Sequence, residues 1–415
     1  MRSILIIHGS AGNGHRAAAM AIQEALESEA ALARDSGAQP IIADSLGFCG
    51  TAFRAAYGKG YELAAQHARW LVRLIYEMTD KPATHSRLVA AIEAATAKKI
   101  TSLMNFIEEN TINTVCCTHY LPMALLARMR RQGRFQGKLH VCVTDYQAHG
   151  FWADPEVDQY YVATPEAGQR LAGWGVHPSR IMETGIPARK RFARVASAAR
   201  RAGESLNVLF MTSSLKEREC RKLLREMSES GPPLSVTVIG GRNHSLLRAL
   251  ASYAPGPHMR LTMKGHVDNL ECLMAESDLV VTKPGGIICT EALCANVPML
   301  FVAPIPMHET LNARLLSAGG AGMMCLAPGS LKAALRYLHD NRELLGDMRQ
   351  ACRRLARPDA ARAIGISLVR ALTDNAARVE SPAWTGQSEW VGVPEKREAA
   401  ADFPEYLHSG RLIFR

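Results

Sequence analysis

A turn of small and polar residues, Gly9-Ser10-Ala11-Gly12-Asn13-Gly14-His15, joins a short apolar run to a segment with apolar residues at helical spacing. This junction predicts a strand that passes directly into a helix, with free N–H groups and the positive end of the helix dipole at the strand's end. Gly12 and Gly14 let a ligand approach the backbone, because glycine has no Cβ atom. We therefore expect an anionic or strongly polar group to bind at this turn.

His15 is the residue of this turn that is suited to proton transfer. A helix dipole favours the neutral form of a histidine in the first turn, and a neutral imidazole suits a general base. A plain tight turn is the alternative that spacing alone leaves open. A dinucleotide site is disfavoured, because the GxGxxG pattern is incomplete and Asp44 lies about ten residues too late for its acidic residue.

A second cluster of polar residues follows two neighbouring apolar runs in the second half of the chain. These residues are Lys283, Gly285, Gly286, Thr290, Glu291, His308, Glu309 and Asn312. Neighbouring parallel strands end at the same edge of a sheet, so we expect these groups to converge. A carboxylate accepts hydrogen bonds from ribose hydroxyls, and the other polar groups are able to contact a sugar. This set of residues therefore suits a nucleotide-sugar. For Glu291 alone, stabilisation of a helix N-terminus is the alternative.

Charge and composition limit the classes of partner. The chain has 415 residues, a formal net charge of +10 and 47% hydrophobic residues, which is typical of an ordered protein that favours anionic partners. Nucleic acid is not expected, because zinc-finger spacing, RNP-type aromatics and long basic tracts are absent from the sequence. Ten cysteines without a CxxC pair and apolar runs shorter than the roughly 20 residues of a membrane span favour a cytoplasmic protein without a metal site.

Apolar runs alternate with helical patterns, which predicts βαβ units and parallel sheets. The pattern restarts after residues 186–205, so we expect an α/β protein of two lobes with its site between them. We predict a first lobe at 1–188, a second at 189–375 and a loosely packed tail at 376–415. The expected strands are Ile4–Ile7, Ile41–Ala43, Val115–Thr118, His140–Val143 and Tyr160–Ala163, then Asn207–Met211, Ser235–Ile239, Arg260–Met263, Leu279–Thr282 and Met299–Val302.

Several motifs resemble, in order and spacing, those of one enzyme family. Besides residues 278–316, they are Tyr76-Glu77-Met78-Thr79-Asp80, Val143-Thr144-Asp145-Tyr146, Thr184-Gly185-Ile186-Pro187, Gly240-Gly241-Arg242-Asn243 and Gly265-His266-Val267-Asp268-Asn269. They are similar to motifs of the glycosyltransferases that include monogalactosyldiacylglycerol synthases and bacterial processive diacylglycerol glucosyltransferases, relatives of the peptidoglycan lipid-intermediate GlcNAc transferase. The resemblance covers roughly residues 3–370.

The resemblance implies a GT-B fold with two Rossmann-like lobes and metal-independent, inverting transfer of a hexose from a UDP-sugar to a diacylglycerol-type lipid. The UDP-sugar is then a co-substrate, and no cofactor is implied. His15 would be the base or a group that positions the acceptor, with Asp145 as the alternative carboxylate. The residues implied for the donor are Gly185, Ser213, Ser214, Lys216, Arg242, Gly265, Val267, Lys283, Gly285, Gly286, Glu291, His308, Glu309 and Asn312. Those implied for the acceptor or membrane are Gly12, Gly14, Tyr57, Trp70 and Trp152.

Two positions depart from the family's pattern. The family's glycine-rich loop after the first strand of the second lobe is replaced here by residues 212–216, where Ser213 and Ser214 are able to cap a helix and donate to a diphosphate. Lys216 adds a positive charge to the same loop. The second departure is His308, where the family tends to have glutamine; this change bears on the sugar that is held.

Residues 52–78 combine aromatic, apolar and basic side chains, among them Tyr57 and Trp70. This composition suits a helix on the anionic inner face of the cell membrane, or an entrance for a lipid acceptor. A helix packed against the first lobe is the alternative that the periodicity supports. Two other functions also remain open for the whole chain: a UDP-sugar epimerase on the same fold, or a protein that binds UDP-sugar or lipid without catalysis.

Overall fold

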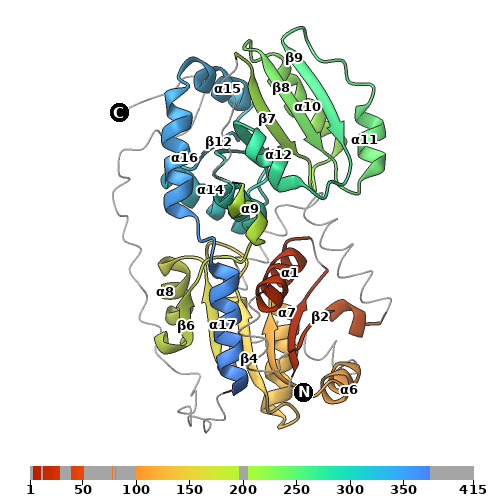
Figure 1. The fold of residues 1–415 in the computed structure, drawn as a ribbon, viewed down its shortest axis with the longest axis vertical. Helices are drawn as coiled ribbons and strands as arrows, with labels where there is room; N and C mark the ends of the chain where they lie inside the picture. Colours follow the sequence, from red (N-terminus) through yellow and green to blue (C-terminus); the bar gives the residue numbers. More distant parts are fainter. Residues whose placement is uncertain are drawn as a thin grey trace.

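The computed structural model describes residues 3–10, 13–28, 39–50, 77, 80, 100–195 and 204–373. They form two α/β lobes, one above the other in Figure 1, each built on a six-stranded parallel sheet. The predicted fold class of two Rossmann-like lobes is confirmed. Gly12, Tyr57, Trp70, most of the segment 52–78 and the tail 376–415 lie outside the described residues, so the predictions made for them stay predictions.

The first lobe has the strand order β2-β1-β3-β4-β5-β6. This order changes direction between β1 and β3, where open α/β sheets bind ligands at the carboxyl ends of the strands. Its strands are β1 (Ser3–His8), β2 (Gln39–Asp44), β3 (Ile112–Cys117), β4 (Lys138–Cys142), β5 (Gln159–Val162) and β6 (Ile181–Glu183). Its helices are α1 (Asn13–Ser28), α6 (Ile100–Glu109), α7 (Tyr120–Arg131) and α8 (Pro165–Gly173), with short 3-10 turns η1 (Ser45–Phe48), η3 (Gly150–Trp152) and η4 (Pro178–Arg180).

The second lobe has the strand order β12-β11-β10-β7-β8-β9, with the change of direction between β7 and β10. Its strands are β7 (Leu206–Met211), β8 (Leu234–Ile239), β9 (Met259–Lys264), β10 (Leu279–Thr282), β11 (Met299–Phe301) and β12 (Gly322–Met324). Its helices are α9 (Lys190–Arg194), α10 (Glu217–Ser228), α11 (His244–Leu250), α12 (Leu270–Glu276), α13 (Gly286–Cys294), α14 (His308–Ala318), α15 (Ser330–Asp340) and α16 (Glu343–Leu355).

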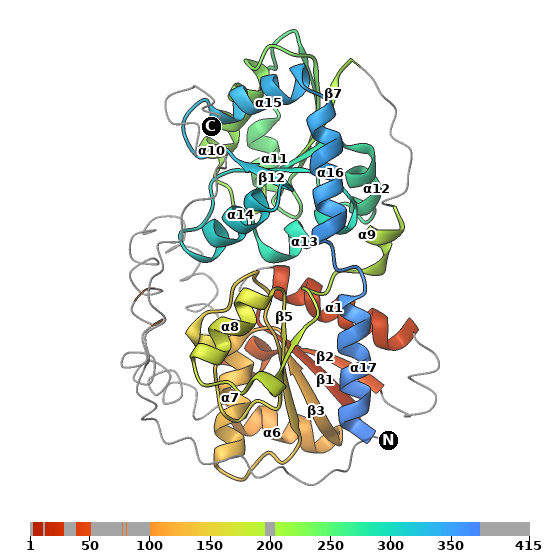
Figure 2. The ribbon, with the colours of Figure 1, turned by 90° about the vertical axis from the view of Figure 1, so that its left-hand side faces the viewer.

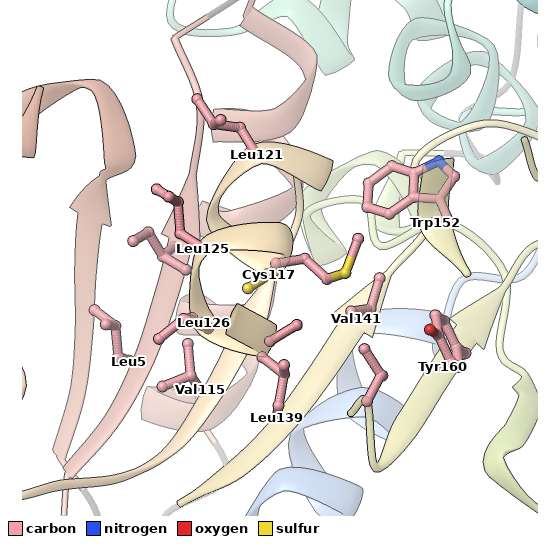
Figure 3. Close-up of a cluster of buried hydrophobic side chains, with 14 of the residues drawn as sticks. Leu5, Val115, Cys117, Leu121, Leu125, Leu126, Leu139, Val141, Trp152 and Tyr160 are labelled. Carbon is pink, nitrogen blue, oxygen red and sulfur yellow. The ribbon is translucent and has the colours of Figure 1, made fainter. Parts of the chain in front are cut away.

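Strand β1 shows how the apolar runs of the sequence become the core. All six of its residues are buried, because helices cover both faces of the sheet. Leu5 and Ile7 join a cluster with α7 and the neighbouring strands, which Figure 3 shows around Val115 and Leu126. Ile4 lies on the opposite face and packs with residues of α1 and of the last described helix.

That last helix, α17 (Ala360–Thr373), corrects the predicted lobe boundary. We expected the second lobe to extend to residue 375, but α17 packs against α1, β3 and β4 of the first lobe, as Figure 1 shows. Ile364 and Leu368 are fully buried there, in the cluster that contains Ile4. The physical reason is that the sheet face around Ile4 needs an apolar cover, which α17 provides.

The ten predicted strands are all present, with ends displaced by at most three residues. Two further strands, β6 and β12, were not predicted; each has three residues, too few for a clear apolar pattern. No helix in the described part of the chain is both long and apolar enough to cross a membrane.

Candidate active site between the lobes

Helix α1 carries His15 in its first turn, at the carboxyl ends of β1 and β3. The Nδ1 atom of His15 lies 2.7 Å from the carbonyl oxygen of Thr118, and the Thr118 hydroxyl donates to the His15 carbonyl at 2.9 Å. A carbonyl oxygen only accepts hydrogen bonds, so Nδ1 carries the proton of the neutral ring. The Nε2 atom is therefore the basic nitrogen of His15.

The pKa of His15 is lowered from its usual 6.5, chiefly because the ring is desolvated. Positive charge on His8 or His308 would lower the pKa further, whereas the Thr118 carbonyl and Asp145 act in the opposite sense. His15 is consequently neutral at pH 7, which is the form that the predicted role as a base requires. The role itself stays a prediction.

His119, which the sequence analysis did not single out, lies directly against His15. The ring of His119 meets the His15 ring edge-on, with 4.5 Å between the ring centroids. His119 begins α7 by accepting a hydrogen bond from the Leu121 N–H at 3.1 Å. A Cβ atom on Gly9 would lie 2.9 Å from the His119 ring, so glycine at this position leaves room for it. The sequence offered no signal for this contact because residues 9 and 119 are far apart.

Thr144, Asp145 and Tyr146 follow β4 and connect the region of His15 to the second lobe. Thr144 Oγ1 lies 3.0 Å from His15 Nδ1, and Asp145 Oδ1 accepts a hydrogen bond from Asn312 Nδ2 at 3.0 Å. Asp145 and His15, the two predicted catalytic residues, thus share one region. Asn312 is fully buried and comes from α14 of the second lobe.

The glycine turn after β10 starts α13 directly against the first lobe. A Cβ atom on Gly286 would overlap the carbonyl oxygen of Thr144, and Gly14 of α1 faces Ile287 of α13. Figure 2 shows the two helices meeting at the junction of the lobes. The positive ends of α1 and α13 are therefore close together. The anion-binding site expected at the first of these helices stays a prediction.

Lys283 and Glu309 lie beside this turn and pair with each other. Lys283 Nζ is 3.4 Å from Glu309 Oε2, and both side chains are largely buried. Glu309 also accepts a hydrogen bond from the Ile305 N–H at 2.5 Å, which fixes the loop before α14. His308 begins α14 and is near enough to influence the pKa of His15.

Glu291 lies on α13, three residues from the end of that helix. Burial raises the pKa of Glu291 to about 7, while Arg191 and Arg189 act to lower it and Glu271 to raise it. The alternative role as a stabiliser of the helix N-terminus is wrong, because Glu291 is not in the first turn. Its predicted contact with the nucleotide stays a prediction.

The loop that departs from the family's pattern keeps the backbone of a glycine turn. Ser214 has φ of +60°, a left-handed conformation that favours glycine. Ser213 and Ser214 are both exposed. The expected serine cap is wrong, because α10 begins after Lys216, whose N–H donates to Glu219 Oε2 at 2.9 Å.

The remaining residues assigned to the donor lie at three places. Arg242 is exposed on the loop before α11, and Gly265 is close to the Gly241 carbonyl on the neighbouring loop. Val267 packs against the cluster beneath α13. Gly185 has φ of +89° and lies against Arg357, where the two chain crossings between the lobes run side by side.

Trp152 corrects one prediction. We expected this side chain near the acceptor or the membrane, but it is only 6% exposed and lies in the core of the first lobe with Val141 and Tyr160 (Figure 3). The adjoining loop is held by Asp80, which accepts from the Gly150 N–H at 3.1 Å and pairs with Arg170. Trp152 is therefore a packing residue. Within the described ranges, no group of three or more His, Cys, Asp or Glu side chains is arranged to hold a metal ion.

Comparison with known sequences gives relatives along most of the chain. A family model described as monogalactosyldiacylglycerol (MGDG) synthase matches residues 15–188. The "Processive diacylglycerol beta-glucosyltransferase" of Bacillus cytotoxicus is 27% identical over 372 residues, which span 86% of this chain and 91% of that protein. These findings confirm the resemblance inferred from the motifs.

Comparison with solved structures identifies the fold. MurG of Acinetobacter baumannii superposes with a TM-score of 0.57 and 16% identity, covering 89% of this chain and all of MurG. A putative UDP-N-acetylglucosamine 2-epimerase of Listeria monocytogenes gives 0.55 and 16%, covering 92% of this chain and 99% of the epimerase. The two-lobed GT-B fold is therefore confirmed, and the fold by itself is common to transferase and epimerase.

Proposed function

Because the chain is related to monogalactosyldiacylglycerol synthases and processive diacylglycerol glucosyltransferases, we propose that it transfers a hexose from a UDP-sugar to a diacylglycerol-type lipid. The observation that carries the proposal is the position of neutral His15 beside the glycine turn that starts α13. One lobe supplies a base, and the other supplies a helix N-terminus for a diphosphate.

The proposed reaction is a single displacement at the anomeric carbon. His15 Nε2 takes the proton of the lipid hydroxyl, the hydroxyl oxygen bonds to the anomeric carbon, and the bond from that carbon to the diphosphate breaks. The configuration at the carbon inverts, and UDP leaves with the bonding electron pair. N–H groups at the start of α13, together with Lys216 or Arg242, stabilise the charge that develops on UDP.

We also propose that the protein works on the anionic inner surface of the cell membrane. The net charge of +10 favours such a surface, and the lipid acceptor resides there. This part of the proposal depends on the segment 52–78, whose aromatic and basic residues suit a membrane interface.

The test uses purified full-length protein, a panel of UDP-sugars and liposomes that contain diacylglycerol. UDP release is followed together with the lipid products by mass spectrometry. Release that depends on the lipid, with one new glycolipid, is the expected result. A changed sugar nucleotide without lipid would instead identify an epimerase, and binding without any turnover would identify a binding protein.

A further inference from the structure

We propose that Thr144, Asp145 and Tyr146 form an interlobe clasp, which holds His15 in position only while the second lobe is docked. The inference deepens the proposed function and rests on it for its catalytic consequence. Each of the three residues contacts the second lobe, and Thr144 also contacts His15. The clasp makes Asn312 and Tyr146 positioning residues for the base.

The Asn312 amide is the centre of the clasp. Its oxygen accepts from the Tyr146 N–H at 3.0 Å, and its nitrogen donates to Asp145 Oδ1 at 3.0 Å and to the Pro284 carbonyl at 3.1 Å. Three of its four hydrogen-bonding positions are thus filled by protein groups. Asn312, implied by resemblance to lie near the sugar, therefore joins the lobes in this arrangement.

The Tyr146 side chain forms a second connection. Its hydroxyl lies 2.9 Å from Thr290 Oγ1, and the Thr290 hydroxyl donates to the Gly286 carbonyl at 2.8 Å. Thr290 has one hydroxyl proton, so Tyr146 is the donor to Thr290. The Tyr146 ring is 6% exposed and packs in a cluster with Ile287 of the second lobe. Separation of the lobes would expose this ring and leave its hydroxyl without Thr290.

Thr144 connects the clasp to the base. Its carbonyl oxygen fits against Gly286, and its hydroxyl oxygen is 3.0 Å from His15 Nδ1. Since Thr144 is two residues from Tyr146, a shift of Tyr146 moves Thr144 relative to His15. A small displacement of a catalytic group is costly, about 10²-fold per Å in unfavourable cases. Docking of the second lobe is thereby coupled to the position of the His15 ring.

The first experiment tests the clasp by a measurement that does not depend on enzymatic activity. Hydrogen exchange is followed by mass spectrometry in peptides that contain the Tyr146 amide, which the other lobe's Asn312 protects. The variants are Asn312→Asp, which retains an acceptor but turns a negative oxygen toward Asp145, and Tyr146→Phe. The matched control is Tyr160→Phe, because the Tyr160 hydroxyl bonds only within the first lobe, to the Asp154 backbone. We expect faster exchange around residue 146 in both variants and no change there in the control.

The second experiment measures steady-state transfer with the same variants. We expect Tyr146→Phe to lower kcat roughly 3- to 10-fold, the range for one lost hydrogen bond, with little change in the KM for donor. Thr290→Ser should retain the rate, because it keeps the hydroxyl, and Thr290→Val should behave like Tyr146→Phe. Unchanged exchange around residue 146 in Asn312→Asp, or a kcat of Tyr146→Phe equal to that of Tyr160→Phe, would overturn the proposal. A wild-type protein without transferase activity would overturn the proposed function, while the exchange result would still decide whether the clasp exists.

Discussion

His15 and Glu291 share one physical feature at the scale of the residue: burial shifts both toward their neutral forms. Desolvation lowers the pKa of the imidazole and raises that of the carboxyl to about 7. For His15 the neutral form is the one that accepts a proton. For Glu291 the charged form is the stronger acceptor for ribose hydroxyls, so a change of pH near 7 affects the two residues differently.

The affinity for UDP-glucose should depend on the ionisation of Glu291. Glu291 is ionised above its pKa of about 7, so affinity should fall about tenfold from pH 8 to pH 6 if the carboxylate binds the ribose. Titration calorimetry with UDP-glucose is suitable, because its diphosphate diester does not ionise in this range. Glu291→Gln should bind more weakly at pH 8 and lose the dependence. An equal dependence in wild type and Glu291→Gln would exclude this role.

The sequence predicted His15 and Gly286 because each belongs to a local strand–turn–helix pattern. It assigned no role to Tyr146 or His119 and placed Thr290 in the nucleotide-sugar cluster instead of against Tyr146. The contacts of these three residues join positions more than a hundred residues apart. Trp152 was misassigned for a related reason. An aromatic residue has the same local pattern in a core as at a surface, and only packing distinguishes the two.

The turns between strand and helix are the elements that build the site. The turn after β10 needs glycine at 286 because the Thr144 carbonyl occupies the space of a side chain. The turn after β7 has a left-handed residue at 214, where this chain carries serine. The positions of strands and helices follow from the local sequence, whereas the residue that packs against each turn is determined by the tertiary fold.

Gly286→Ala should prevent the two lobes from docking. The added Cβ atom overlaps the Thr144 carbonyl, so we expect the transfer rate to fall about 10²-fold through misplacement of the reacting groups. The control is Gly346→Ala on the exposed side of α16, where nothing lies within 4 Å of an added Cβ. That change should leave the rate intact and stabilise the protein by about 0.5–1 kcal/mol. Initial rates of Gly286→Ala within threefold of wild type would contradict the close approach of Gly286 to the Thr144 carbonyl.

At the scale of the whole molecule, the chain crosses from the first lobe to the second and then returns to the first lobe with α17. The repeated strand–helix pattern was enough to predict two lobes and ten strands, because buried parallel strands are continuous apolar runs. It did not predict the return of α17, since an amphipathic helix does not specify which lobe covers its apolar face. The fold of the first lobe therefore depends on residues 360–373, distant in sequence.

Leu368→Ala should destabilise the first lobe by about 2–5 kcal/mol, the usual cost for a fully buried leucine. Leu368 is fully buried in the cluster with Ile4 and Ile6. Urea unfolding followed by tryptophan fluorescence suits the measurement, because residues 204–359 contain no tryptophan. Leu326→Ala, at a site 43% exposed, is the control and should change stability by less than about 0.5 kcal/mol. A change below about 1 kcal/mol for Leu368→Ala would mean that α17 contributes little.

The most direct test of the central claim compares wild type with His15→Ala in lipid-dependent transfer. The account predicts a rate lower by roughly 10²–10⁴-fold, the range for a general base, with UDP affinity retained. At saturating UDP-sugar the wild-type rate should be constant near pH 7 and fall only below pH 6.5, because the pKa of His15 is lowered from that value. His258→Ala, at an exposed histidine, controls for the substitution. A His15→Ala rate within about threefold of wild type would contradict a site centred on His15.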